Sequence, residues 1–293
     1  MKIGICCEFY ERWKDQRYRK MREFGFTHVD YGMANTELRF YSCSDAELEK
    51  MMLHEKALME EAGIGISQVH GPWRWPAQDS TREEREERME KMKRSIRATA
   101  LLGCKNWVIH PLMPCGPEEK DTADAQTTWD LNRSFMSELL ETAKAHDVTI
   151  CLENMPLPEF SMGSPMEVLS FVKMMNDDHF KICLDTGHAS VYEELSPADA
   201  VRLLGDEIRV LHVHDNRGKG DLHLLPYFGF IDWNDFGRAL KEIGFQGVFS
   251  YEAFLFPGLP DEYLEEFSRI LVRIAREILS DDGSMESCEI LGC

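Results

Sequence analysis

Short apolar runs alternate with longer polar stretches along nearly the whole chain, with a period of roughly 35 residues that fits one strand–helix unit. Each run is rich in β-branched residues, and the stretch that follows has a helical composition. The runs are continuous rather than strictly alternating, which is typical of strands covered on both faces, as in parallel sheets. Eight such runs are found, at 2–7, 28–32, 65–71, 106–111, 149–154, 180–186, 208–215 and 247–254.

The polar stretches carry signals for the start of a helix. Ser44–Glu47 and Ser80–Glu83 both fit the capping box, in which a Ser or Thr and a Glu three residues later satisfy each other's backbone N–H groups. Ser164 and Ser196 are each followed by proline, which favours serine as the N-cap and proline as the first helical residue. These signals predict helices between the strands.

Eight strand–helix units in 293 residues predict a single (β/α)8 TIM barrel. The barrel is expected to cover residues 1–280. The remaining residues, 281–293, have no partner strand and are expected to form a disordered C-terminal tail.

The charge of the chain argues against two classes of partner. It has 52 acidic and 33 basic residues, a net charge of −19. Nucleic acids and anionic membranes are bound through Lys and Arg, which neutralise phosphate charge. We therefore expect neither nucleic acid nor membrane as a partner.

The cysteines and the N-terminal stretch predict a cytoplasmic protein. Nine cysteines are scattered without a CxxC pair, and Cys6, Cys151 and Cys183 lie inside apolar runs, as buried reduced thiols do. The opening MKIGICCEFYERWK becomes charged too soon for a signal peptide, and no stretch approaches the roughly 18 apolar residues of a membrane span.

Histidine, aspartate and glutamate residues stand at the ends of the predicted strands. In a TIM barrel the groups of the active site lie at the C-terminal ends of the strands. Here those positions hold His70, His110, Glu153, Asp185, His188 just beyond its strand, His212, His214 and Glu252.

Taken singly, a histidine at a strand end is more often structural than functional. The barrel mouth, however, brings all strand ends to one centre, where several carboxylates and imidazoles are costly unless something compensates them. A divalent cation does so directly. Mixed carboxylate and imidazole ligands suit Mn²⁺, Zn²⁺, Co²⁺ or Mg²⁺ better than a soft metal, so the pattern predicts a metal site.

The chain resembles the xylose-isomerase-like TIM barrels, a superfamily that includes sugar isomerases and epimerases, inosose dehydratase and endonuclease IV. The resemblance covers nearly all of residues 2–278. The motif after Leu211 is the most specific and looks most like the sugar isomerase/epimerase branch. The motifs are CLENMP at Glu153, CLDTGHA at Asp185, LHVHDNRGKGDLHLLPYFGFIDW from Leu211, and SYEAF at Glu252.

Resemblance to the ketose 3-epimerases implies one divalent metal ion held by Glu153, Asp185, a strand-seven histidine and Glu252. Mn²⁺ is the first expectation, with Zn²⁺, Co²⁺ and Mg²⁺ as alternatives. The strand-seven ligand of that family stands three residues before an acidic residue, which selects His212. His214 has the same strand parity and stays a second candidate.

The same resemblance implies proton abstraction beside the carbonyl of a keto-sugar, with Glu153 and Glu252 as acid and base and His188 on a substrate oxygen. Trp73 and Trp75 are expected to stack on a sugar face, as are Phe9 and Tyr10, although ordinary loop packing explains all four equally well. The substrate-binding set is therefore predicted as His70, His110, His188, His214, Arg217, Asp221, His223, Trp73 and Trp75.

Two other activities stay open. A 3-oxo-glycoside lyase, such as a C-glycoside deglycosidase, needs the same metal and bases and can work with a small partner subunit. An endonuclease IV-like trinuclear zinc phosphoesterase would use nine ligands, and its D-x-H spacing recurs at Asp221 and His223. The counterparts of the nine in this chain are His70, His110, Glu153, Asp185, His188, His212, Asp221, His223 and Glu252. The charge and the missing Gly-Glu-Gly turn after His223 count against it. A non-phosphorylated sugar or glycoside and a homo-oligomer are expected.

Overall fold

The computed structural model describes residues 2–73, 81–113, 125–253 and 258–280. Trp75 and the predicted tail at 281–293 lie outside the described residues.

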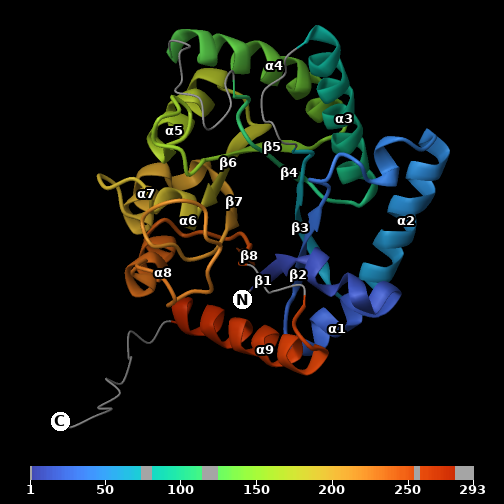
Figure 1. The fold of residues 1–293 in the computed structure, drawn as a ribbon, viewed down its shortest axis with the longest axis vertical. Coiled ribbons are helices and arrows are strands. Elements are labelled where there is room, and N and C mark those ends of the chain that lie inside the picture. The colour runs from blue at the N-terminus through green and yellow to red at the C-terminus, as the bar shows by residue number, and fades with distance from the viewer. Residues whose placement is uncertain (1, 74–80, 114–124, 254–257, 281–293) are drawn as a thin grey trace.

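The strands form one parallel eight-stranded sheet that closes on itself, which confirms the predicted (β/α)8 barrel (Figure 1). Each strand from β1 to β6 pairs with the next in sequence, and β1 also pairs with β8. An isolated bridge between Val213 and Tyr251 joins the β7 and β8 sides. The strands are β1 (Ile3–Cys6), β2 (His28–Gly32), β3 (Gly65–His70), β4 (Asn106–Ile109), β5 (Thr149–Glu153), β6 (Phe180–Asp185), β7 (Ile208–His212) and β8 (Phe249–Tyr251).

The helices form an outer ring around the strands, as Figure 1 shows, and α9 closes the ring beside α1. In the described part of the chain, 3-10 helices cover Cys7–Gln16 (interrupted at Lys14), Arg39–Tyr41 and Gly205–Glu207. The α-helices are α1 (Arg17–Phe24), α2 (Asp45–Ala62), α3 (Arg82–Leu101), α4 (Ala125–Ala145), α5 (Pro165–Met175), α6 (Thr186–Ala189), α7 (Pro197–Leu204), α8 (Trp233–Glu242) and α9 (Asp261–Ile278).

Three of the four predicted helix starts are confirmed. Ser44 caps α2 in a capping box, and Ser164 and Ser196 cap α5 and α7 ahead of their prolines. The box at Ser80–Glu83 is wrong by one residue: Thr81 accepts a hydrogen bond from the N–H of Glu84, and Glu84 accepts one from the N–H of Thr81. The sequence STREE contains both registers, and the helix begins at the second.

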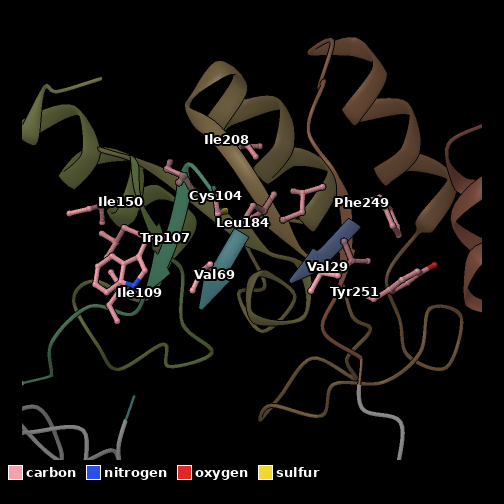
Figure 2. Packing of buried hydrophobic residues seen from close by; sticks show 14 of the residues in the cluster. Val29, Val69, Cys104, Trp107, Ile109, Ile150, Leu184, Ile208, Phe249 and Tyr251 are labelled. Atoms are coloured by element: carbon pink, nitrogen blue, oxygen red, sulfur yellow. The ribbon is translucent and has the colours of Figure 1, made fainter. Parts of the chain in front are cut away.

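The main core lies between the barrel wall and the helices, and Figure 2 shows part of it. Trp107 on β4 is fully buried there, and its indole N–H donates to Ser95 of α3. A second, smaller cluster comes from four adjacent strands and consists of Val108, Cys151, Cys183 and Val210. Cys151 and Cys183 are buried free thiols, as predicted, whereas Cys6 is only partly buried. Tyr10 also belongs to the main core, where its hydroxyl lies 2.8 Å from that of Ser268, so its predicted stacking on a sugar is wrong.

The segment 213–231, which we call the β7–α8 segment, folds back on itself instead of extending the strand to Asp215. Asp215 and Leu224 exchange two backbone hydrogen bonds of 2.7 and 3.0 Å. The Asp215 carboxylate accepts hydrogen bonds from the backbone N–H groups of Asn216 and Ile231 and from the indole N–H of Trp233. This buried carboxylate therefore holds both ends of the segment.

None of the helices in the described ranges has the length and apolarity required to cross a bilayer.

We predict that Asp215→Ala lowers the free energy of unfolding by about 3 kcal/mol, because three buried N–H groups lose their acceptor. Thermal and urea unfolding measure the change. The exposed Asp206→Ala is the matched control and should unfold like the unmodified protein. Equal stability of the two variants would contradict the role of Asp215.

Candidate metal centre

Four side chains of the predicted ligand set meet at the barrel mouth. Glu153, Asp185 and His212 are the last residues of β5, β6 and β7, and Glu252 follows β8. One ligand atom from each lies within 4.8 Å of the others. The first three are fully buried, and the side chain of Glu252 is 17% exposed. The carboxyl ends of parallel strands converge in a barrel, which is why residues so distant in sequence share this point.

The geometry and chemistry of this group fit a divalent cation. His212 Nδ1 lies 3.0 Å from Glu153 Oε1 and 3.2 Å from Glu252 Oε2. Glu153 Oε2 and Glu252 Oε2 are buried and accept no hydrogen bond from a described residue. Buried carboxylate oxygens without donors are strongly disfavoured. Hard oxygen and imidazole ligands are those that Mn²⁺, Zn²⁺, Co²⁺ and Mg²⁺ accept.

Neighbouring residues and burial shift the pKa values of the two glutamates in opposite directions. Burial alone would raise the pKa of Glu153, but the facing imidazoles of His212 and His110 bring that pKa well below its usual range. Burial raises the pKa of Glu252 well above its usual range, and the charge of Glu153 adds to the effect. Both carboxylates therefore face the same imidazole, that of His212.

Asp30, in the middle of β2, orients His212 from the far side of the ring. Asp30 Oδ2 lies 3.0 Å from His212 Nε2 and accepts a second bond of 2.9 Å from the side-chain amide of Gln68. A carboxylate that takes the Nε2–H leaves the Nδ1 lone pair facing Glu153 and Glu252. Sequence reasoning missed this residue, although a buried aspartate inside the apolar run HVDYG is itself a signal.

Cys183 also lies beside the four ligands, and sequence reasoning did not predict it as a residue of the site. Burial raises the pKa of the Cys183 thiol well above its usual value. Its sulfur lies within 4.8 Å of the ligand atoms of Glu153 and His212. Cys183 therefore lies close enough to Glu153 and His212 to border the site.

His70 and His110 lie against the outer oxygen of Glu153. Their Nε2 atoms are 3.7 and 3.3 Å from Glu153 Oε2. The pKa of His70 falls to about 4 through burial and the neighbouring His110, so its imidazole is neutral near pH 7. The His70 ring is parallel to that of His212, with centroids 5.6 Å apart. The structure thus places both residues at the mouth, where sequence analysis expected substrate-binding groups.

The two strand-seven candidates point to different groups. His212 faces Glu153 and Glu252, whereas His214 Nε2 lies 2.9 Å from Asp185 and 4.0 Å from Asp221. Together with His188 and His223, His214 and Asp221 form a separate group whose ligand atoms also lie within 4.8 Å of one another. The arrangement supports His212 as the ligand that joins the four-residue set.

Backbone-directed hydrogen bonds fix the orientation of this region. Asn154 links β5 to β6, since its side chain donates to the carbonyl of Asp185 and accepts from the N–H of the same residue. Asp185 in turn caps α6 by accepting the N–H of His188 at 2.6 Å. Thr186 donates to the carbonyl of His214 at 2.6 Å. These bonds connect three neighbouring strand ends.

The remaining predicted residues lie further out. Trp73 is partly exposed, and its ring lies 5.9 Å from that of His110. The exposed Arg217 sits on the β7–α8 segment and donates to the carbonyl of Phe228 at 3.3 Å. A substrate that reached both residues from the four-residue set would have to be large enough to extend outward along the mouth.

A (β/α)8 barrel with carboxylates and imidazoles gathered at the C-terminal ends of its strands is the architecture of a TIM-barrel enzyme whose site suits a metal ion. The chain belongs to the xylose isomerase-like TIM barrel family, whose model matches residues 18–271.

Several similar proteins carry the name of a sugar epimerase. The D-psicose 3-epimerase of Ruminiclostridium cellulolyticum is 27% identical over 266 residues, which cover 87% of this chain and 84% of that protein. The D-psicose 3-epimerase of Agrobacterium fabrum is 28% identical over 265 residues, which cover 88% of this chain and 86% of that protein.

Solved structures agree on the fold. D-psicose 3-epimerase with D-tagatose, from Clostridium cellulolyticum H10, superimposes with a TM-score of 0.77 at 22% identity over 96% of this chain and all of that one. A D-tagatose 3-epimerase-like protein gives a TM-score of 0.73 at 26% identity, covering 95% and 98%. The IOLI protein, described with a binding zinc atom, gives a TM-score of 0.73 at 18% identity and covers 96% of this chain and 98% of its own.

We predict that Gly187→Ala disturbs the mouth, because a Cβ there would lie 2.0 Å from the imidazole of His214. Overpacking of this kind costs about 1–3 kcal/mol, to be measured by thermal unfolding. The control is Gly258→Ala, where the added carbon meets no atom within 4 Å. Unchanged stability of Gly187→Ala would show that His214 can move away freely.

Proposed function

We propose that this protein is a divalent-metal-dependent sugar epimerase or isomerase. The observation that carries the proposal is the meeting of Glu153, Asp185, His212 and Glu252 at one buried point, with two carboxylate oxygens that lack hydrogen-bond donors. The similar proteins named D-psicose 3-epimerase, which match most of the chain, support the same class. Mn²⁺ is the metal that we expect first, and the zinc in the IOLI structure makes Zn²⁺ the main alternative.

The proposed reaction begins with removal of a proton from the carbon next to a sugar carbonyl. A bound divalent cation supplies Lewis-acid stabilisation of the negative charge that develops on the carbonyl side. Glu153 and Glu252 come from strands β5 and β8, and one removes the proton while the other returns a proton to the opposite face. Return to the opposite face inverts that carbon and produces the epimer.

Other residues at the mouth hold the substrate and the bases in place. Asp30 keeps His212 turned toward the two glutamates, at 3.0 and 3.2 Å from their oxygens. His188, which is 3% exposed, is proposed to hold a substrate oxygen, with His70 and His110 on the other side of Glu153. Trp73 and Arg217 would contact the outer part of a larger substrate, such as a glycoside.

A 3-oxo-glycoside lyase stays within the same chemistry, because elimination also begins with proton removal beside a carbonyl. The partly exposed Trp73 ring next to His110 favours this alternative, since an aromatic surface suits an aglycone. Product analysis separates the two: an epimerase returns an isomeric sugar, and a lyase releases the aglycone.

A trinuclear phosphoesterase is the second candidate, because the nine residues expected for it do assemble into adjoining groups. The net charge of −19 disfavours a nucleic-acid substrate. Elemental analysis discriminates, since three zinc ions per chain with release of phosphate from an abasic DNA strand would favour this activity.

The buried reduced thiols Cys151 and Cys183 support a cytoplasmic location. A homo-oligomer and a small partner subunit stay predictions.

We predict that Glu252→Gln lowers the turnover of an active keto-sugar at least 100-fold, because general-base catalysis contributes roughly that factor. The measurement is incorporation of deuterium from deuterated water at the carbon next to the carbonyl, starting with D-psicose. Glu266→Gln, an exposed change on α9, should exchange at the unmodified rate.

A shielded proton would not exchange with solvent, and no deuterium would then enter the product. In that case the primary isotope effect on turnover is measured with substrate deuterated at the same carbon. Products formed with neither label nor isotope effect would contradict proton abstraction.

We predict that Asp30→Ala weakens divalent-metal affinity about 10–100-fold, the range seen when a carboxylate behind a metal-bound histidine is removed. The metal affinity of Asp30→Asn should lie between those of the unmodified protein and Asp30→Ala, because the uncharged amide oxygen still accepts a hydrogen bond from His212. Calorimetric titration with Mn²⁺ or Zn²⁺ gives the affinity, and circular dichroism confirms folding. A folded Asp30→Ala protein with unmodified affinity would refute the orienting role.

A further inference from the structure

A carboxylate outside the four-residue set also lies at the barrel mouth. Glu8 follows β1, near the start of the 3-10 helix Cys7–Gln16. Its carboxylate fills the space that a side chain on Gly32, the last residue of β2, would occupy, because a Cβ added to Gly32 would lie 1.2 Å from Glu8 Oε1. Glu8 therefore takes the place of a β2 side chain at the end of the barrel wall.

The β2 strand sets the direction and the height of this position. Asp30 lies two residues before Gly32, and Gly32 pairs with His70 of β3. Asp30, which bonds His212, and His70 both point into the mouth. Alternate residues of a strand share a face, so the position of Gly32 also faces the mouth, about 7 Å further out than Asp30. The Glu8 carboxylate occupies that position.

The Glu8 carboxylate is open to a ligand. The residue is exposed to solvent. Apart from its own backbone N–H, no group of the described residues donates a hydrogen bond to its carboxylate, and no Lys or Arg among them forms an ion pair with it. The walls of the mouth nevertheless enclose it, and this burial raises the pKa of Glu8 to about 7, with the charges of Asp30 and Glu11 adding to the effect. A hydroxyl group both donates and accepts, so it can bond this carboxyl group with or without its proton.

We propose that Glu8 determines substrate specificity by binding the hydroxyl group at the end of the sugar that is remote from the metal, the C6 hydroxyl of a free ketohexose. A sugar whose carbonyl side lies at the four-residue set extends outward along the mouth, and Glu8 lies one layer of side chains above Asp30 and His212. Glu8 binds the substrate and takes no part in proton transfer. The choice of sugar rests on the proposed function, whereas the place of Glu8 in the mouth does not.

The test compares two sugars that differ in one hydroxyl group. Full-length protein loaded with Mn²⁺ is titrated calorimetrically with D-psicose and with 6-deoxy-D-psicose. The unmodified protein should bind D-psicose about 10–100-fold more tightly, the range for loss of a hydrogen bond to a charged group. Glu8→Ala should bind the two sugars equally, because the hydroxyl group has lost its partner. Glu11→Gln, an exposed change on the same 3-10 helix, should keep the preference.

An unmodified protein that binds neither sugar, or that binds both equally, would overturn the proposal. So would a Glu8→Ala protein that keeps the preference for D-psicose. Circular dichroism and the affinity for Mn²⁺ confirm that each variant is folded and loaded.

Gly32→Ala tests the position of the carboxylate without removing it. The added methyl group would meet Glu8 Oε1, the end of a flexible side chain, and move the carboxylate aside. The preference for D-psicose should then fall as in Glu8→Ala. Gly258→Ala, where the added carbon meets no atom within 4 Å, is the control and should keep the preference. A folded Gly32→Ala protein with the full preference would contradict the placement of Glu8.

Turnover separates this inference from the proposed function. In Glu8→Ala the KM for an active keto-sugar should rise about 10–100-fold with kcat unchanged, because the lost bond is equally strong in the ground state and the transition state. A lower kcat with unchanged KM would contradict the binding role. Equal kinetics in Glu8→Ala and the unmodified protein would remove the inference and leave the epimerase standing. A Glu8-dependent preference in binding, without proton exchange or product, would remove the epimerase and leave the inference standing.

Discussion

The region described here depends on one constraint: carboxylates and imidazoles are buried together at the barrel mouth without enough hydrogen-bond donors. Glu153, Asp185 and His212 are fully buried, and the outer oxygens of Glu153 and Glu252 accept no hydrogen bond from the described residues. Parallel strands in a barrel impose this meeting, because their carboxyl ends converge. A bound divalent cation relieves it directly, which is why the account rests on metal binding.

Surrounding residues maintain this arrangement. Asp30 turns His212 toward the glutamates, and Asn154 joins the ends of β5 and β6. Asp215 holds the two ends of the β7–α8 segment, which brings Asp221 and His223 back over the mouth. The segment thus connects the stability of the barrel with the geometry of its site, and a change at Asp215 should affect both.

The barrel and the polar strand ends could be predicted from sequence because both depend on local patterns, whereas the choice of four ligands among those strand ends rested on the family resemblance. Continuous apolar runs mark the strands, and Glu153 or Asp185 stands out where such a run ends. Asp30 escaped notice because it lies inside its run rather than at the end. The end of β7 at His212 and the grouping of His188 with His223 depend on the fold-back at Asp215 and Leu224, a long-range contact that no local pattern contains. The start of α3 was misplaced by one residue because two capping registers overlap there.

The most direct test of the central claim is anomalous diffraction from crystals grown with Mn²⁺, recorded on the metal's absorption edge. The account predicts an anomalous peak bounded by oxygens of Glu153, Asp185 and Glu252 and by Nδ1 of His212, with Nε2 of that ring still on Asp30. No peak among these four side chains at saturating Mn²⁺, or a peak coordinated by His214 with His212 turned away, would contradict it.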